Sequence, residues 1–544
     1  MILELGWWSE GCLEQEGYAL LKLKHDFFNN HCCQWACVEC NTTTGKVISL
    51  DLDGTRKLGD GEGYLNASLF TSFQQLELLD LSSNHIVGCI RNEERLSSLS
   101  NFRFLDLSFN SFNNSILSSL VGFSSLRILS LACNRLEGSI DVKELDSLSN
   151  LEELDMSFNE IENLLVPKDY ISLKNLHSLH LSGLRIRAGS TVLHSMGSFP
   201  SLETLSLQSN NFKETVTLTQ ESHNFTNLEE FTLDGSFLYI SLLQSIASFT
   251  SLKTLSMNFC EFNGVLPRDR GILNFKNLEY FNMDFCTAFS NSFLQMSESM
   301  ASLKYLSLSN SYLNGTILDQ GLCELVYLQE VNIDRNNLSG SLPWCLANLT
   351  YLRLLDVSFN QLTENISSSP LMNLTYIEEL WLSNNHFQIS ISLEPFFNHS
   401  KLKFFDGDIY AEIETSHSSL TPKFQLTSIS LFGHGDSGIF PKFLYHQHDL
   451  EYVDLSHLNL TREFPNWLLE KNKKLKRLSL VNISLFGPFP LPIHCHKNLR
   501  VLDVSNNKLQ GHIPIEIGEV LPNLVVLNVA TNAFNGSIPS SFGV

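Results

Sequence analysis

The stretch Leu352–Leu362 reads LRLLDVSFNQL, with apolar residues at its first, fourth, sixth and eleventh positions and asparagine at its ninth. The same order returns as LELLDLSSNHI from Leu76, LEELDMSFNEI from Leu151 and LRVLDVSNNKL from Leu499. Alternate residues of a strand point to opposite faces, so the fourth and sixth residues share one apolar face. The pattern therefore predicts a short strand, buried on one side, in every unit.

Such units recur about every 25 residues, a period typical of leucine-rich repeats. They open at Leu76, Phe102, Leu126, Leu151, Leu176, Leu202, Leu228, Leu252, Leu278, Leu303, Leu328, Leu352, Ile377, Leu402, Leu426, Leu450, Leu475, Leu499 and Leu524. The segment VISLDL from Val47 is a degenerate first unit, which brings the total to about 20. A single unit cannot bury its apolar face alone, so the units must stack.

The predicted fold class is an α/β repeat solenoid. It is a leucine-rich repeat superhelix with a continuous parallel β-sheet on its concave face and about 20 coils of ~25 residues. We expect two parts in the chain, an N-terminal cysteine-containing cap over residues 1–46 and the solenoid over residues 47–544.

Asparagine at the ninth position is expected to form a ladder, because its amide can satisfy buried backbone groups from both ends. It recurs at Asn84, Asn110, Asn134, Asn159, Asn210, Asn336, Asn360, Asn385, Asn507 and Asn532. A weaker ladder is expected where the position holds Ser236, Cys260, Cys286 and Ser311, and again where it holds Tyr410, His434, Leu458 and Ile483. The unit at Leu402 has Gly407 at a core leucine position, but its spacing is kept, which predicts a degenerate coil.

The composition excludes several functions. Lys and Arg number 36 against 58 Asp and Glu, a net charge of −22, which disfavours binding of DNA or RNA backbones. No stretch approaches the roughly 18 apolar residues that a membrane helix needs. The sequence lacks phosphate-binding, dinucleotide, metalloprotease and serine-hydrolase motifs, so we predict a non-enzyme without a cofactor.

Cysteines and glycosylation motifs indicate an extracellular-facing glycoprotein. Of the 12 cysteines, Cys12, Cys32, Cys33, Cys37 and Cys40 crowd the N-terminus, as in a disulfide-stapled cap. The N-x-S/T acceptors are Asn41, Asn66, Asn113, Asn224, Asn314, Asn337, Asn348, Asn365, Asn373, Asn398, Asn459, Asn482 and Asn535.

Three cysteine motifs have competing interpretations. The Cys37-x-x-Cys40 spacing occurs in zinc and redox sites, but a disulfide cap is favoured in a secreted chain. His494-Cys495-His496 suggests a metal site, but a solvated convex loop is favoured, because adjacent side chains diverge. Cys260 and Cys286 occupy the asparagine position of successive coils, and buried thiols in the ladder are favoured over a disulfide.

Some units continue as GVLP from Gly264, GSLP from Gly340, GHIP from Gly511 and GSIP from Gly536. The preceding cap reads CLEQEGYALLKLKHDF…HCCQWACVECNTTTGKVISLDL. With these motifs, essentially the whole chain resembles the extracellular half of plant leucine-rich repeat receptor-like proteins.

The resemblance implies a plasma-membrane receptor without a kinase of its own. Its ectodomain would bind a peptide, protein or glycan signal, in defence or development, and signal through a receptor-like kinase adaptor and a co-receptor. It also implies the disulfides Cys12–Cys32, Cys33–Cys40 and Cys323–Cys345, although Cys37 departs from the family pattern. The chain stops at Val544, inside its last unit, whereas the family continues to a membrane helix, so we expect a fragment or a truncated product.

Two alternatives follow from the same repeats. One is a secreted inhibitor of microbial wall-degrading enzymes, which resembles this repeat type but is about half as long. The other is a non-functional fragment that lacks a closing cap.

The candidate ligand-binding residues are the solvent-facing positions of the units between Leu228 and Ile377, where aromatic anchors lie among carboxylates. They are Glu230, Asp234, Phe259, Tyr280, Asp284, Phe285, Tyr305, Glu330, Asp334, Arg335 and Trp381, together with Glu379. The alternative is that these Asp residues are repeat defaults and that the Phe residues pack sideways along the sheet.

Overall fold

The computed structural model describes residues 37–56, 62–66, 70–90, 101–167, 172–186, 196–212, 225–263, 275–286, 300–317, 322–409, 420–433 and 438–543, as well as Glu16, Ala19, Leu20 and Leu193. The chain divides into two compact units, Met1–Leu278 and Glu279–Val544.

The first unit contains a parallel sheet with one strand from each coil. Its strands, in order, are β2 (Val47–Asp51), β4 (Leu78–Asp80), β6 (Phe104–Asp106), β7 (Ile128–Ser130), β9 (Glu153–Asp155), β11 (Ser178–His180), β12 (Thr204–Ser206), β13 (Glu230–Thr232) and β15 (Thr254–Ser256). Strand β1 (Val38–Cys40) pairs antiparallel to β2.

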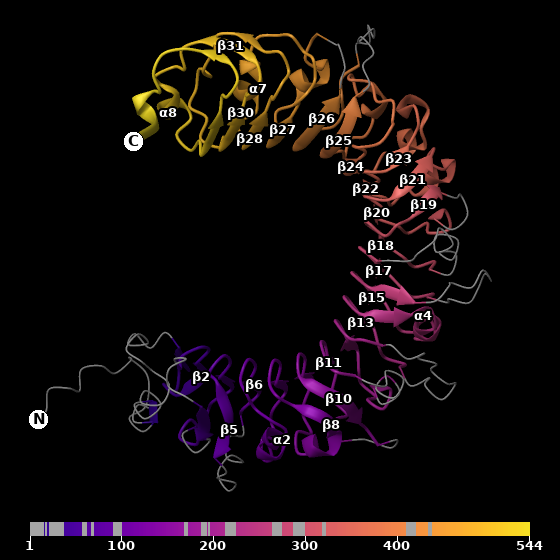
Figure 1. Ribbon diagram of the computed structural model, residues 1–544, viewed down its shortest axis with the longest axis vertical. Coiled ribbons are helices and arrows are strands. Elements are labelled where there is room, and N and C mark those ends of the chain that lie inside the picture. The colour runs from indigo at the N-terminus through magenta and orange to yellow at the C-terminus, as the bar shows by residue number, and fades with distance from the viewer. Residues whose placement is uncertain are drawn as a thin grey trace, which may run out of the picture. The chain divides into compact units, whose positions relative to one another are not determined.

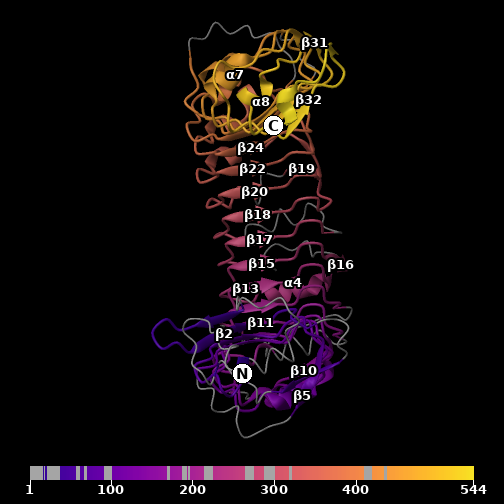
Figure 2. The ribbon, with the colours of Figure 1, turned by 90° about the vertical axis from the view of Figure 1, so that its left-hand side faces the viewer.

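The second unit repeats this arrangement. Its parallel strands are β17 (Tyr280–Asn282), β18 (Tyr305–Ser307), β20 (Glu330–Asn332), β22 (Leu354–Asp356), β24 (Glu379–Trp381), β25 (Phe404–Ile409), β26 (Ser428–Gly433), β27 (Tyr452–Asp454), β28 (Arg477–Ser479), β30 (Val501–Asp503) and β32 (Val526–Asn528). Figure 2 shows β17, β18, β20, β22 and β24 as successive rungs. Apart from β1 and β2, each of these strands begins two residues after the opening of a predicted repeat, so the predicted register is confirmed.

Short strands and helices lie on the side of each unit opposite the sheet (Figure 1). In the first unit these are β3 (Gly63–Asn66), β5 (Ile86–Ile90), β8 (Glu137–Asp141), β10 (Glu160–Leu165), β14 (Phe237–Tyr239), β16 (Glu261–Asn263), α2 (Ser115–Ser119), η3 (Val142–Leu145) and α4 (Ile240–Ile246). In the second they are β19 (Asn314–Thr316), β21 (Asn337–Gly340), β23 (Gln361–Leu362), β29 (Phe486–Gly487), β31 (Lys508–Gly511), β33 (Ala533–Phe534), η6 (Trp344–Asn348), η7 (Ile366–Ser368), η8 (Pro370–Asn373), η9 (Glu394–Phe396), η10 (Lys442–His446), α7 (Asn466–Lys471), α8 (Ile517–Val520) and η11 (Ser540–Gly543). Each unit is a leucine-rich repeat solenoid, which confirms the predicted fold class.

The leucines of each coil are buried because they pack against the coils on either side. Leu499, Leu502 and Val504 are 0% exposed, with a coil on either side. The equivalent residues of the last coil, Leu524, Leu527 and Val529, are only partly buried. Stacking, rather than the fold of one coil, therefore removes the apolar surface from water.

The asparagine ladder is present, and Asn360 shows how it works. Its Nδ2 donates to the carbonyl of Ile333 in the preceding coil at 2.9 Å, and its Oδ1 accepts from the Leu338 N–H at 3.0 Å. Equivalent bonds are made by the other nine predicted asparagines, for example by Asn507. Both ends of each amide satisfy buried backbone groups, as predicted.

The ladder is weaker in the two predicted stretches. Ser236, Cys260 and Ser311 each keep one side-chain bond to a carbonyl of the preceding coil, such as Cys260 Sγ to Leu233 O at 3.2 Å. Leu458 and Ile483 are fully buried and have no polar side-chain atom. Tyr410 and His434 lie outside the described residues. The interpretation of Cys260 as a buried ladder thiol is thus confirmed.

The unit at Leu402 is a coil, as predicted, and its glycine has a packing reason. A Cβ on Gly407 would lie 2.8 Å from Ile389 Cδ1 and 3.1 Å from Phe405 Cε1. These two buried side chains occupy the volume that leucine fills elsewhere.

Candidate ligand-binding face

In most coils the eighth residue of the repeat, just before the ladder position, has its side chain outside the core, whereas Ile409, the eighth residue of the repeat at Leu402, is buried. The eighth residue has a left-handed backbone, with φ between 47° and 67°, at Ser83, Phe109, Cys133, Phe158, Ser209, Phe259, Phe285, Asn310, Arg335, Phe359, Asn384, His457, Asn482, Asn506 and Thr531. This conformation is costly for phenylalanine, so the stacked turns must impose it. It leaves Phe259 63% exposed and Phe285 42% exposed. The ring of Phe359 lies against Arg335 of the preceding coil, so sideways packing along the sheet stays an alternative interpretation of these phenylalanines.

Two aromatic stacks stand on the sheet of the second unit. The rings of Tyr280 and Tyr305 are parallel, with centroids 4.2 Å apart and an interplanar angle of 5°. Three strands further on, Trp381 stacks on Phe404 at 3.8 Å and 25°. Burial is the main cause that raises the pKa of Tyr305, and the neighbouring Tyr280 raises it further.

Phe404 was missed by the sequence-based prediction, because it lies in the unit that Gly407 made look degenerate. The signal was nevertheless present, since Phe404 occupies the third position of its unit, the same position as Tyr280 and Tyr305.

A charged cluster lies between the two stacks. Arg335 Nε is 3.2 Å from Asp334 Oδ2, and its guanidinium lies 4.3 Å from the centroid of the Phe359 ring. Glu330 is exposed on β20, whereas Glu379 on β24 is half-buried. Arg335 therefore holds an aromatic ring and a carboxylate in one surface patch.

Two of the predicted carboxylates are engaged in bonds within the fold. Asp284 accepts from Ser307 Oγ at 2.6 Å and from the Ser309 N–H at 2.7 Å. Asp234 makes the equivalent bonds in the first unit, to Ser256 Oγ and the Asn258 N–H. Each carboxylate ties its coil to the next, so neither offers a fully available charge to a ligand.

The structure brings together only part of the predicted set. Tyr280, Asp284, Phe285, Tyr305, Glu330, Asp334, Arg335 and Trp381 belong to the second unit, on β17, β18, β20 and β24 or the turns after them, and β22 lies between β20 and β24. Glu230, Asp234 and Phe259 belong to the first unit, where Glu230 lies exposed on β13.

Three further carboxylates of the second unit, Asp356, Asp406 and Asp408, were not among the candidate residues. Burial is the main cause that raises the pKa of Asp356, to about 6, and the nearby charges of Asp334 and Asp406 raise it further. Burial likewise raises the pKa values of Asp406 and Asp408. Asp356 and Asp406 occupy the fifth position of their repeats, where aspartate recurs in many coils, whereas Asp408 occupies the seventh.

Cross-strand ion pairs run along one edge of both sheets. Lysine and glutamate at the second positions of neighbouring coils pair at 2.6 to 2.7 Å in Glu229–Lys253, Glu279–Lys304, Glu378–Lys403 and Glu451–Lys476. Their lysines are exposed to solvent, so these pairs add little to stability, and we interpret them as helping to set the pairing of strands.

Comparisons with known proteins agree with this architecture. Residues 327–349 and 498–520 match the family described as Leucine Rich Repeat. The chain is 35% identical over 572 aligned positions to Cuscuta receptor 1 of Solanum lycopersicum, an alignment that covers 95% of this chain and 50% of the relative. It is 37% identical over 555 positions to Receptor-like protein 13 of Arabidopsis thaliana, covering 95% of this chain and 47% of the relative. This chain belongs to the plant leucine-rich repeat receptor-like proteins.

The receptor-like protein spans about half the length of the curated relatives it matches. Among solved structures it is similar to the plant peptide hormone receptor RGFR1 in complex with RGF2. The TM-score is 0.53 at 24% identity, covering 94% of this chain and 81% of that one, and this likeness supports the fold. In the described part of the receptor-like protein, no helix has the length and apolar character needed to cross a membrane.

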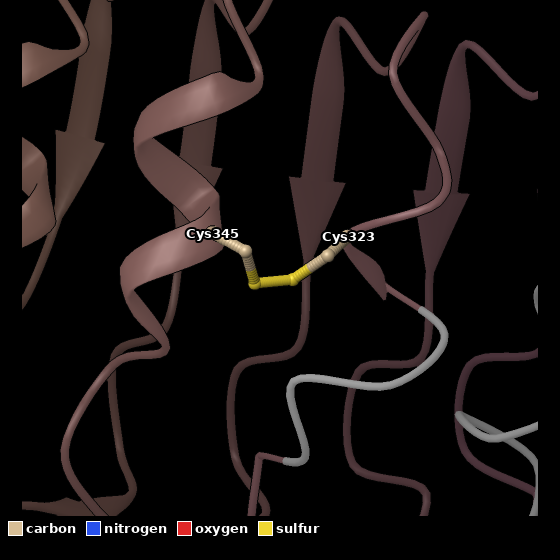
Figure 3. The surroundings of a disulfide bond; sticks show 2 residues. All are labelled: Cys323 and Cys345. Atoms are coloured by element: carbon tan, nitrogen blue, oxygen red, sulfur yellow. A yellow bond between two sulfur atoms is a disulfide. The ribbon is translucent and has the colours of Figure 1, made fainter.

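One predicted disulfide of the receptor-like protein is confirmed. Cys323 and Cys345, on neighbouring coils, are bonded with their Cα atoms 5.5 Å apart (Figure 3). Cys40 is also disulfide-bonded, but its predicted partner Cys33, like Cys12 and Cys32, lies outside the described residues.

The interpretation of His494-Cys495-His496 as a solvated loop is wrong for His496. This residue is buried, with Nε2 2.9 Å from Asn472 O and Nδ1 accepting from the Leu499 N–H. The reason is its place three residues before a unit opening, where an inward-pointing side chain bridges two coils. No cluster of His, Cys, Asp and Glu suited to a metal ion occurs among the described residues.

The predicted glycosylation acceptors lie at the surface wherever their side chains are described. Asn41 is half-buried, and the exposed ones are Asn113, Asn314, Asn337, Asn348, Asn365, Asn373, Asn398, Asn459, Asn482 and Asn535. Asn224 lies outside the described residues, and the side chain of Asn66 is not described. This exposure contrasts with the buried ladder asparagines and is compatible with a glycan at each site.

Proposed function

We propose that this chain is the ligand-sensing ectodomain of a plant cell-surface receptor, and that it binds an extended peptide on the sheet of its second unit. Binding is non-catalytic recognition, and signalling passes through a receptor-like kinase adaptor and a co-receptor at the plasma membrane. The observation that carries the proposal is the pair of aromatic stacks with Arg335 and Glu330 between them.

The spacing of the stacks suits a short extended segment. From β18 to β24 there are three strand steps, or about 14 Å at about 4.8 Å each. An extended peptide covers that distance with about four residues. The stacks would take two apolar side chains, and Glu330 would pair with a basic residue between them.

A solved structure of similar fold supports a peptide as the class of ligand, but it does not identify the peptide. One solved neighbour is described as a peptide hormone receptor bound to its peptide, and its fold is similar to this one. The identity is too low to transfer contacts, so the peptide preference here rests on the aromatic and charged residues of this chain.

The test compares two triple variants of the secreted, full-length chain. Replacing Tyr280, Tyr305 and Trp381 by alanine should remove binding to an array of synthetic peptides with apolar residues flanking Lys or Arg. The control replaces Tyr312, Tyr327 and Trp344, which are aromatics outside the strands and more exposed than the three on the sheet. Equal binding by both variants, or binding only to a parallel array of wall oligosaccharides, would overturn the proposal.

A further inference from the structure

A row of exposed tyrosines occupies a position that holds a hydrogen-bonding asparagine in other coils. In six described coils the residue just before the unit opening is an asparagine whose Nδ2 donates to a carbonyl of the preceding coil, as from Asn277 to Thr250 O and from Asn498 to Lys473 O, each at 2.7 Å. In three successive coils of the second unit this position holds Tyr327, Tyr351 and Tyr376 instead. They are 54%, 57% and 60% exposed.

Two of these tyrosines follow a glycosylation acceptor by three residues. Asn348 precedes Tyr351, and Asn373 precedes Tyr376, in the identical stretches NLTY. Asn348 is the last residue of η6 and Asn373 the last of η8. After each, the backbone closes the same tight turn, with the Thr350 N–H bonded to Asn348 O and the Thr375 N–H to Asn373 O, both at 2.9 Å.

This turn places the acceptor and the ring on one bend. The leucine between them, Leu349 or Leu374, points inward and is buried, while the asparagine and the tyrosine on either side are exposed. The first sugar of an N-linked glycan is attached directly to the asparagine Nδ2. One pyranose face carries only C–H groups, and a tyrosine ring offers an apolar face with a polar tip.

We infer that Tyr351 and Tyr376 are platforms for the first N-acetylglucosamine of glycans on Asn348 and Asn373. During secretion an oligosaccharyl pyrophosphate lipid supplies the sugar. The Nδ2–C1 bond forms, the C1–O bond to phosphate breaks, the amide nitrogen loses a proton and the lipid pyrophosphate leaves. The stacked sugars then cover this flank of the second unit and direct the glycans along it.

The chain contains both matched controls. Tyr327 occupies the same position after the same turn, but Glu324 stands where the acceptor would be. Asn398 is an acceptor followed by the same turn, but Lys401 stands where the ring would be. The inference depends only on the secretory route, so it stands or fails independently of the ligand on the sheet.

The test uses the full chain secreted with high-mannose glycans labelled with ¹³C at the N-acetyl methyl groups. An endoglycosidase trims each glycan to its first sugar. Asn348→Gln, Asn373→Gln and Asn398→Gln assign the methyl resonances, and mass spectrometry measures occupancy. Ring currents should shift the Asn348 and Asn373 signals away from the Asn398 signal.

Substitutions exchanged between coils then decide the outcome. Tyr376→Lys should return the Asn373 signal to the position of the Asn398 signal, and Lys401→Tyr should shift the Asn398 signal in the opposite sense. Tyr327→Lys should move neither the Asn373 signal nor the Asn398 signal; the Asn348 signal is left out of this control, because the Tyr327 ring lies 6.1 Å from the Tyr351 ring. Signals unmoved by Tyr351→Lys and Tyr376→Lys, or no glycan on either asparagine in the secreted protein, would overturn the inference.

Discussion

Asp356 shows how one residue makes the stability of the second unit depend on pH. Its pKa is about 6 in the folded chain against an ordinary value of 3.8, so the native state binds its proton more tightly than the unfolded state. The stabilisation is complete below about pH 4 and is lost as the pH rises through 6. Ser358 partly offsets the burial by donating two hydrogen bonds to the carboxylate.

We predict that Asp356→Asn removes this pH dependence. At pH 7 the variant should have a free energy of unfolding about 3 kcal/mol higher than wild type, and at pH 4 the two should agree. Urea unfolding at the two pH values measures the effect. Asp503→Asn is the control, because Asp503 accepts the same two bonds from Ser505. Its strand neighbours are Ser479 and Asn528, whereas those of Asp356 are Asn332 and Trp381.

His399 should have the opposite effect on the pH dependence of stability. Burial lowers its pKa below the ordinary 6.5, while its ring bridges Phe396 O and Leu371 O. The unfolded state therefore takes up the proton first, and stability falls as the pH drops below about 6.5.

Replacing His399 by glutamine should make the second unit less sensitive to acid. Gln447 occupies the same position two coils later, fully buried and bonded to the Leu426 N–H, so the amide suits this site. Thermal unfolding at pH 7 and pH 5 measures the difference. If His399→Gln and wild type lose the same stability between these pH values, the buried imidazole is not responsible.

At the scale of the element, the Cys323–Cys345 bond joins neighbouring coils across a separation of 22 residues. A loop of this size implies about 3 kcal/mol of stabilisation through the unfolded chain. The double variant Cys323→Ser/Cys345→Ser should lose about that much in chemical unfolding under oxidising conditions. An unchanged midpoint would mean that the stacked coils hold these turns without the bond.

The strands were predictable from the sequence because each coil places the same apolar residues in the same position. Even the unit with Gly407 keeps its register, since Ile389 and Phe405 fill the missing volume. Side chains that bond across coils were harder to predict. Nothing in the repeat pattern shows that Asp284 accepts hydrogen bonds from Ser307 and Ser309, or that His496 reaches Asn472. These contacts depend on how two neighbouring coils pack against each other.

In the candidate ligand-binding site, too, single residues were predictable from the sequence, and contacts between coils were not. Tyr280, Tyr305 and Trp381 stand out by size at solvent-facing positions, and the structure places the two tyrosines in one stack. The partner of Trp381, Phe404, and the pairing of Arg335 with the Phe359 ring required the actual stacking of coils.

At the scale of the whole molecule, each coil interacts with its two neighbours, so stability should be modular. Removing one complete coil, residues 352–376, brings the coil of Leu328 against that of Ile377 with every apolar and ladder position still matched. Asn385 would then take the place of Asn360. We predict that this variant is secreted and keeps the circular dichroism of the full chain.

Removing only residues 352–364 should have the opposite result. The deletion leaves an incomplete coil, so leucines would meet polar positions and the carbonyls of the preceding coil would lose their asparagine partner. Retention in the cell and rapid proteolysis should follow, although fewer residues are lost than in the 25-residue deletion. Equal secretion of the two deletions would mean that neighbouring coils do not have to match in register, and the partly buried leucines of the coil at Leu524 would then need another explanation.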